Sequence, residues 1–300
     1  MRPVCTKSCV QRTREPGRAA ATPKMEEHIS IVTQYINHFF GHAALALLAA
    51  LHIKPNHPEL PIPEHVSMAL VVLVIGTVLA LLLRARLSVE NPGATQQIAE
   101  GLLTNQVGFG IKDLLEENVH HGAAKMVPLV GSISIFILLS NLLGIIPVFS
   151  SPTSEKTVPL ACATLTFLYF NYYGFRHHGL VRYLLTFAGS PKSVGDWILA
   201  VLLFPVELVS TLARLLSLTV RLWANIVASE LIYGVFLSLL TAAALGAWTK
   251  SSVLGIIVAV FPAIIPVAFI GLHIFVAVIQ AYIFTVLPSV YLGMATADEH

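Results

Sequence analysis

An arginine inside a long apolar stretch is the first residue of this sequence that could do chemistry. Arg221 lies in the segment 218–230, which also contains Asn225 and Glu230. A guanidinium stays protonated at any ordinary pH, so it cannot escape the cost of burial by losing its charge. Holding such a cation inside a bilayer costs about 2.5–3.5 kcal/mol or more, and intramembrane charges are therefore functional candidates by default. The rest of the chain is expected to present this arginine to a partner.

The charged residues of this stretch recur at spacings that define the faces of a helix. Glu207, Arg214 and Arg221 are seven residues apart, and seven steps of about 100° leave a drift of only about 20°, so the three share one face. Asn225 stays within about 40° of Arg221, whereas Glu230 is about 180° round and faces away. Two polar surfaces on opposite sides of one helix indicate two separate aqueous approaches, with Arg221 between them.

The last apolar stretch carries a second pair of polar residues. His273 and Gln280 are also seven residues apart and share a face. If Glu230 lies beside His273, the two form a carboxylate–imidazole pair that titrates near neutral pH and can relay protons. The alternative is that His273 is an ordinary hydrogen-bonded residue of a helix bundle.

Pairing within the chain is the structural alternative for the other charges. Glu207 and Arg214 can pair with each other and then need no further role. No carboxylate of this chain lies within a helical turn of Arg221 in the sequence, and a buried unpaired cation requires a partner carboxylate. We therefore expect another chain to supply that carboxylate.

The composition is that of a membrane protein. Of the 300 residues, 56% are hydrophobic and 11% are charged, against roughly 25% charged in soluble domains. A net charge of +2 and the lack of a basic stripe with interleaved aromatic residues exclude nucleic acid as an expected partner. A membrane-embedded hydrolase is not supported either, because the sequence has no HExxH motif and no nucleophile–base pair.

The sequence predicts no cofactor and no metal site. Cys5, Cys9 and Cys162 make no disulfide framework, and Cys162 lies in an apolar segment where packing is its expected role. Cys5 and Cys9 could form a metal or redox pair, but two ligands do not close a zinc site. His38 and His42 are i,i+4 neighbours without a third ligand nearby, which favours two interfacial histidines.

Hydrophobic runs predict an all-α, polytopic membrane fold with about five to six membrane helices. Residues 1–25 are Arg-rich without an apolar core and are expected to be a disordered or misassigned N-terminal extension. Residues 26–296 form a single membrane domain. Its predicted parts are a first span at 66–83, an interfacial helix at 95–120, spans at 126–149 and 157–175, and a hairpin of two long tilted helices at 197–248 and 251–294.

The two stretches of the hairpin are each about twice the ~20 residues that a perpendicular span needs. Each could instead fold into two spans. No polar turn interrupts either stretch midway, and the second contains only Pro262 and Pro266 as breaks. This favours long tilted helices joined near Lys250.

Basic residues predict the orientation in the membrane. Arg84 and Arg86 follow the first span, and Arg176 and Arg182 follow the span at 157–175. Under the positive-inside rule these ends are cytoplasmic. The N-terminus is then outside and the C-terminus is in the cytoplasm.

Three groups of motifs resemble subunit a of the rotary F-type ATP synthase. They are Leu216-Ser-Leu-Thr-Val-Arg-Leu-Trp-Ala-Asn225 followed by Glu230, His273 through Gln280-Ala-Tyr-Ile-Phe284, and Asn141-Leu-Leu-Gly-Ile-Ile-Pro147 with Asn91-Pro-Gly. The resemblance covers residues 26 to 296 approximately. It implies a non-catalytic stator subunit of the bacterial inner membrane that couples proton flow to ATP synthesis. Its implied partners are the c-subunit ring, the b subunits of the peripheral stalk, the rest of the complex and membrane lipid.

The resemblance also implies roles for single residues. Arg221 matches the stator arginine that faces the carboxylates of the rotating ring, and Asn225 and Gln280 match polar residues that flank it. Glu230 and His273 match positions of the half-channel that opens to the periplasm. ATP chemistry would take place on partner subunits, since this chain has no Gly-rich phosphate loop.

The resemblance is less specific for the residues of the cytoplasmic half-channel. The chain also departs from the family pattern at several positions. Glu207 matches an acidic residue of the cytoplasmic half-channel, and Arg214 on the same face is a further candidate for proton translocation. Many members carry an acidic residue in the loop after the second span, where this chain has Glu155 next to Lys156, and many carry glycine at the position of Ala224. The route of proton access, the choice of H⁺ or Na⁺ and the ring size stay open.

A secondary transporter is the competing interpretation, with Arg221 binding an anionic substrate. Transporters of that class usually contain inverted repeats with broken helices in matching halves. The sequence shows no internal repeat, and its two overlong stretches are adjacent. This favours the stator interpretation.

Overall fold

The computed structural model describes residues 30–50, 52, 60–88, 92–104, 110–119, 122–146, 149–189, 194–249, 251, 253 and 264–296. The predicted extension at 1–25, with Cys5 and Cys9, lies outside these ranges, as do Asn91, Lys250 and Pro262.

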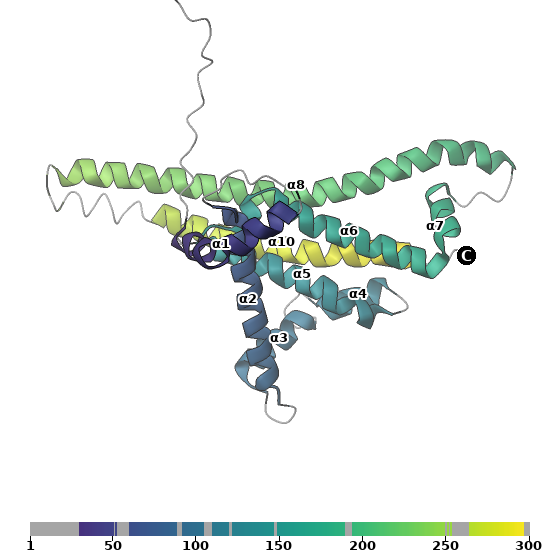
Figure 1. The fold of residues 1–300 in the computed structure, drawn as a ribbon, viewed down its shortest axis with the longest axis horizontal. Helices are drawn as coiled ribbons and strands as arrows, with labels where there is room; N and C mark the ends of the chain where they lie inside the picture. Colours follow the sequence, from purple (N-terminus) through teal and green to yellow (C-terminus); the bar gives the residue numbers. More distant parts are fainter. Residues whose placement is uncertain are drawn as a thin grey trace, which may run out of the picture.

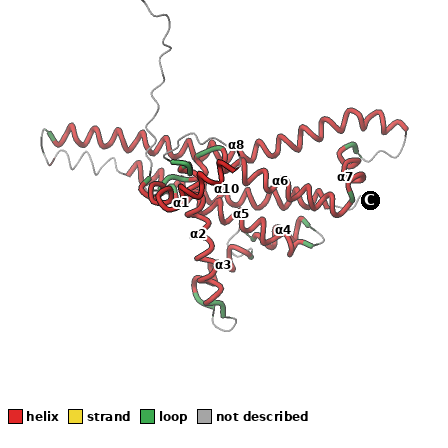
Figure 2. The backbone as a smooth tube through the Cα atoms, viewed as in Figure 1, coloured by secondary structure: helices red, strands yellow, loops and turns green. Residues whose placement is uncertain are grey.

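Within the described ranges every element is a helix, which confirms the all-α prediction (Figure 2). The elements are α1 (Ile31–Ala50), α2 (Glu64–Ala85), α3 (Ala94–Leu103), α4 (Ile111–Asn118), α5 (Ala123–Leu143), the short 3₁₀ helix η2 (Pro152–Ser154), α6 (Thr157–His178), α7 (Leu180–Phe187), α8 (Val194–Trp248) and α10 (Ile264–Thr296).

Four of the described helices are long and apolar enough to cross a membrane: Glu64–Ala85, Ala123–Leu143, Gly195–Trp248 and Val267–Met294. The chain is therefore a multi-pass membrane protein. Helix α6 covers the predicted span 157–175 but is not among these four. The reason is its polar second half, which contains Asn171, Tyr172 and Tyr173. It nevertheless packs against α8 and α10 inside the bundle.

Helix α8 is one continuous helix of 55 residues rather than two spans. At 1.5 Å per residue it extends about 80 Å, whereas the hydrocarbon core of a bilayer is about 30 Å thick. A helix of this length cannot stand upright in the membrane and must lie strongly tilted. Figure 1 shows α8 running across the molecule while α2 runs in a different direction, and α10 lies alongside its middle.

One apolar cluster fixes the middle of α8 against the bundle. Its buried members come from four helices, so the cluster joins residues more than 150 positions apart in sequence. They are Ile133 and Ile137 of α5, Ala163 of α6, Leu218, Leu222 and Ile226 of α8, and Phe284 of α10. Because the three α8 residues follow each other at i,i+4, they commit one face of α8 to the core.

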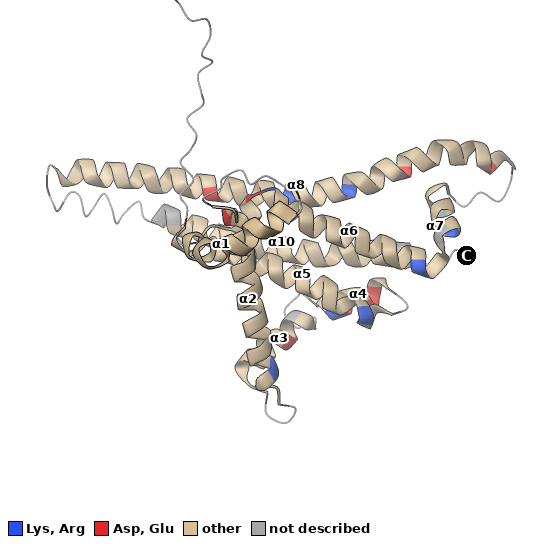
Figure 3. Ribbon diagram, viewed as in Figure 1, with Lys and Arg blue, Asp and Glu red and all other residues tan. Residues whose placement is uncertain are grey.

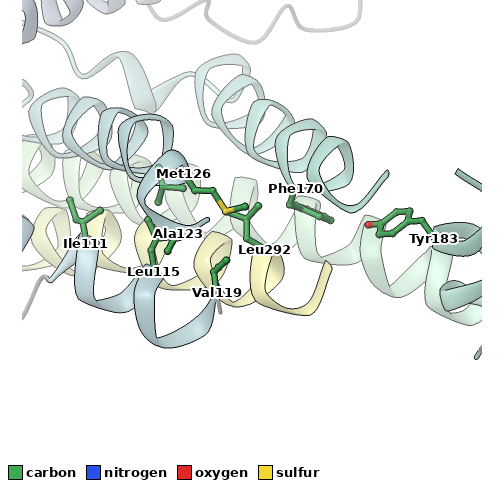
Figure 4. Packing of buried hydrophobic residues seen from close by; sticks show 9 residues of the cluster. Ile111, Leu115, Val119, Ala123, Met126, Phe170, Tyr183 and Leu292 are labelled. Carbon is green, nitrogen blue, oxygen red and sulfur yellow. The ribbon is translucent and has the colours of Figure 1, made fainter. Parts of the chain in front are cut away.

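The predicted interfacial helix at 95–120 is divided in the structure. Helices α3 and α4 lie in this range, and residues 105–109 between them are outside the described ranges. Helix α4 is amphipathic, with Lys112 and Glu116 exposed, but Ile111 and Leu115 are buried against α5 and α10 (Figure 4). Its apolar side therefore covers protein, whereas the sequence pattern alone cannot distinguish protein from lipid as the apolar partner.

Gly293 of α10 allows the close approach of α4, because a Cβ there would overlap the backbone carbonyl of Asn118 at the end of α4. We expect Gly293→Ala to destabilise the subunit by about 1–3 kcal/mol, as overpacking does. The measurement is thermal unfolding of the purified subunit in detergent. Gly271→Ala in the same helix is the control, since nothing lies within 4 Å of a Cβ at Gly271. Equal melting temperatures for the two variants would contradict the packing argument.

Candidate functional site

Arg221 projects from the face of α8 that points away from the bundle. Leu222, at the next position, is completely buried, whereas Arg221 and Asn225 are exposed. Among the residues that the structure describes, Arg221 has no hydrogen bond and no ion pair. The chain thus holds a permanent cation on an apolar outer surface and leaves the guanidinium available to another molecule.

An amide pair lies one turn from the arginine. Asn225 Nδ2 donates to Gln280 Oε1 across the α8–α10 contact at 3.4 Å. Gln280 is 1% exposed, and its Nε2 has no partner among the described residues. A buried amide N–H without a partner indicates a place for water. The amide pair therefore connects the outer face of α8 to the buried Gln280 Nε2 inside the bundle.

Glu207 and Arg214 form the ion pair that their spacing allows, with Nη2 and Oε1 3.2 Å apart. The Arg214 guanidinium also lies over the Tyr291 ring of α10, 5.4 Å from its centroid. Both charges line an open cavity of about 220 Å³. Arg214 is thus held by two partners within the chain, whereas no described residue holds Arg221, so the two arginines are physically different.

Glu230 faces the inside of the bundle, opposite Arg221. It lines a small cavity of about 30 Å³, together with Gly144, Ser229, His273 and other residues. A volume of this size holds about one or two waters. Among the described side chains Glu230 and His273 form no direct ion pair. The structure thus shows no direct carboxylate–imidazole contact, and both residues line the same small cavity.

His273 is instead held by two hydrogen bonds. Its Nε2 lies 3.1 Å from the Asn141 backbone carbonyl, and its Nδ1 lies 2.9 Å from Ser229 Oγ. A carbonyl only accepts, so Nε2 must carry a proton. The Ser229 hydroxyl donates to the Ile226 carbonyl at 2.9 Å, which leaves it free to accept from a protonated Nδ1, and it can turn its single proton to Nδ1 when that nitrogen carries none. The network accommodates both protonation states of the imidazole.

Gly144 makes room for the Glu230 carboxylate. A Cβ at Gly144 would lie 3.3 Å from Glu230 Oε1 and 2.9 Å from the Ser151 Cβ. Ser229, Gly144 and Ser151 were absent from the sequence-based site. Only the position of Ser229 next to Glu230 could have indicated one of them.

The predicted residues therefore fall into three groups along α8 and α10. Arg221, Asn225 and Gln280 form the group at the outer face of α8. Figure 3 shows how few charges the long helices carry and that they gather on the middle of α8. The group inside the helix bundle is Glu230 with His273, and the third group is the Glu207–Arg214 pair. Cys162 packs beside the apolar cluster of α8, and no three potential ligands gather as a metal site in the described ranges.

The chain is similar to known proteins along most of its length. Residues 65–293 match the family described as ATP synthase A chain. The ATP synthase subunit a of Koribacter versatilis is 35% identical over 268 residues, which cover 89% of this chain and 97% of that protein. The ATP synthase subunit a of Solibacter usitatus is 38% identical over 263 residues, covering 87% of this chain and 100% of that protein. The chain belongs to the ATP synthase subunit a family.

Proposed function

We propose that this chain is the non-catalytic stator subunit that conducts protons to and from a rotating ring of c subunits, with Arg221 facing the ring. The observation that carries the proposal is the exposed Arg221 guanidinium, which has no partner among the described residues and lies on a face of α8 outside the apolar cluster. A ring helix that packs against this face would bring its carboxylate to Arg221. The transporter alternative is not favoured, because the relatives described above are subunits of ATP synthases.

The charge of Arg221 is expected to stabilise the ionised form of a nearby ring carboxylate strongly. Two unit charges 4 Å apart interact with about 4 kcal/mol at an effective dielectric constant of 20. A guanidinium at that distance therefore favours the ionised form of a ring carboxylate by a factor of about a thousand. Because arginine cannot give up its proton, it promotes proton release from the carboxylate without becoming part of a proton wire. It thus separates the two half-channels.

The two polar groups on either side of Arg221 are proposed as these half-channels. Glu230 and His273, with the small cavity between them, belong to the outer one, and Glu207 with Arg214 belongs to the inner one. Basic residues after α2 and α6 support the orientation with the N-terminus outside and the C-terminus in the cytoplasm. The expected location is the bacterial inner membrane, with b subunits of the peripheral stalk as further partners.

A cysteine cross-linking scan tests the placement of the ring directly. Ser217, Ala224 and Ala228 are exposed on the side of Arg221, whereas Leu218 and Ile226 are buried. We expect cysteines at the three exposed positions to cross-link to the carboxylate-bearing helix of a co-expressed c subunit, and cysteines at the two buried positions to give none. Cross-links at neither set would place the ring elsewhere.

Replacing the arginine should separate proton transport from ATP hydrolysis. We expect Arg221→Ala to reduce ATP-driven proton pumping in membrane vesicles by at least about a hundredfold, given the factor of a thousand estimated for the ion pair. ATP hydrolysis by the soluble sector should be largely retained. Arg84→Ala, at the exposed end of α2, is the control and should pump normally. Pumping by the Arg221 variant at the level of the control would refute the stator role.

Replacing Glu230 should reduce proton transport less than replacing Arg221. We expect Glu230→Gln to reduce passive proton flux through the membrane sector by about tenfold, which is less than the roughly hundredfold or greater effect usual for loss of a proton-transfer group. The effect is limited because the cavity has room for water, which can carry protons past a missing relay. The flux is measured with the soluble sector removed. A loss of ATP-driven pumping in Glu230→Gln equal to that in Arg221→Ala would make Glu230 the indispensable group.

A further inference from the structure

A polar corner lies between the outer end of α2 and the neighbourhood of Glu230. We use the name serine corner for residues 150–153, which lie between α5 and α6 and include the start of η2. At one side of the corner, Ser150 Oγ donates to Glu64 Oε1 at 2.7 Å. Helix η2 contacts both α2 and α8. Two carboxylates that are 166 positions apart in sequence therefore approach the same four residues.

The other side of the serine corner lies near Glu230. Ser151 and the Glu230 carboxylate both border the small space beside Gly144, where a Cβ would lie 2.9 Å from the Ser151 Cβ and 3.3 Å from Glu230 Oε1. Ser150 and Ser151 are adjacent in the chain. A single peptide unit thus separates the serine that binds Glu64 from the serine that borders Glu230.

Unpartnered polar atoms lie in the same corner. Ser151 Oγ donates to the Ser140 carbonyl at 3.1 Å, and Thr153 Oγ1 donates to Asn141 Oδ1 at 2.6 Å. Ser140 and Asn141 are both completely buried, yet Ser140 Oγ and Asn141 Nδ2 have no partner among the described residues. Orphaned buried donors of this kind indicate bound water. The corner is therefore expected to be hydrated and not a dry packing contact.

Glu64 lies at the end of α2 that is expected to face the outer side of the membrane, from which protons enter. It lies in the first turn of α2, whereas Arg84 lies in the last turn, so the positive-inside rule puts Glu64 at the outer surface. Glu155 is the other carboxylate of this region. Its side chain is exposed beside η2 and makes no hydrogen bond with any described residue.

We infer that Glu64 is the carboxylate that collects protons at the outer surface and passes them over the Ser150–Ser151 corner to Glu230. Glu64 takes a proton from outer water and returns to its ionised form when the proton moves to the hydroxyl and water of the corner. The inference rests on the proposed function and names the access residue of the outer half-channel, with Glu64 in preference to Glu155.

The test compares Glu64→Gln with Glu155→Gln in the intact complex. Passive proton conduction is measured in vesicles after removal of the soluble sector. A glutamine at position 64 can still accept the Ser150 hydrogen bond but cannot carry a proton, so a merely structural role would survive the change. We expect Glu64→Gln to lose about tenfold in conduction, the low end of the range for electrostatic focusing of a charged substrate. Glu155→Gln should conduct as the wild type does.

The other outcomes overturn the inference. Wild-type conduction in Glu64→Gln would exclude Glu64 as the collector, and equal losses in both variants would mean that only surface charge matters. If Glu64→Gln fails to assemble, as judged by membrane-bound ATP hydrolysis, Ser150→Ala replaces it, and undiminished conduction in that variant would exclude the route. Arg221→Ala is measured in parallel. Loss of ATP-driven pumping in that variant, together with full passive conduction in Glu64→Gln, would reject this inference and leave the proposed function intact.

Discussion

The burial of one face of α8 is the constraint on which the rest of the structure depends. Leu218, Leu222 and Ile226 pack against α5, α6 and α10, and this contact fixes the rotation of α8 about its own axis. Once the rotation is fixed, Arg221 must point outward and Glu230 must point inward, because they lie on opposite sides of the helix. Burying two or three large aliphatic side chains is worth several kcal/mol in ordinary cores. In lipid, close packing replaces the hydrophobic effect as the source of this stability.

Sequence spacing alone gives a large part of this arrangement. The seven-residue steps from Glu207 to Arg221 place three charges on one face, and the ion pair of Glu207 with Arg214 follows from the same geometry. The length of the apolar stretch at 197–248 predicts a tilted helix, since a bilayer is too thin for it to stand upright. Within one helix, position along the chain determines position in space, and so these predictions need no knowledge of the fold.

Contacts between helices are the part that the sequence does not give. His273 hydrogen-bonds to Ser229 and to the Asn141 backbone instead of pairing with Glu230, because the packing of α5 against α10 places a carbonyl in front of the imidazole. Likewise, nothing in the residue pattern relates Glu64 to Ser150. The apolar side of α4 also gives the same signal whether it covers lipid or protein. Such choices depend on which helices become neighbours.

The tilt of α8 has a consequence for the direction of rotation. In an upright helix, sequence separation becomes depth in the membrane, but in a helix that lies across the membrane it becomes sideways displacement. Arg221 and Glu230 are nine residues apart, which is about 13 Å along the helix axis, and Glu207 is offset by about 20 Å to the other side. On the proposed function, the two half-channels therefore end at different points around the rim of the rotor. The order of three residues along one helix then sets which way the rotor turns for a given direction of proton flow.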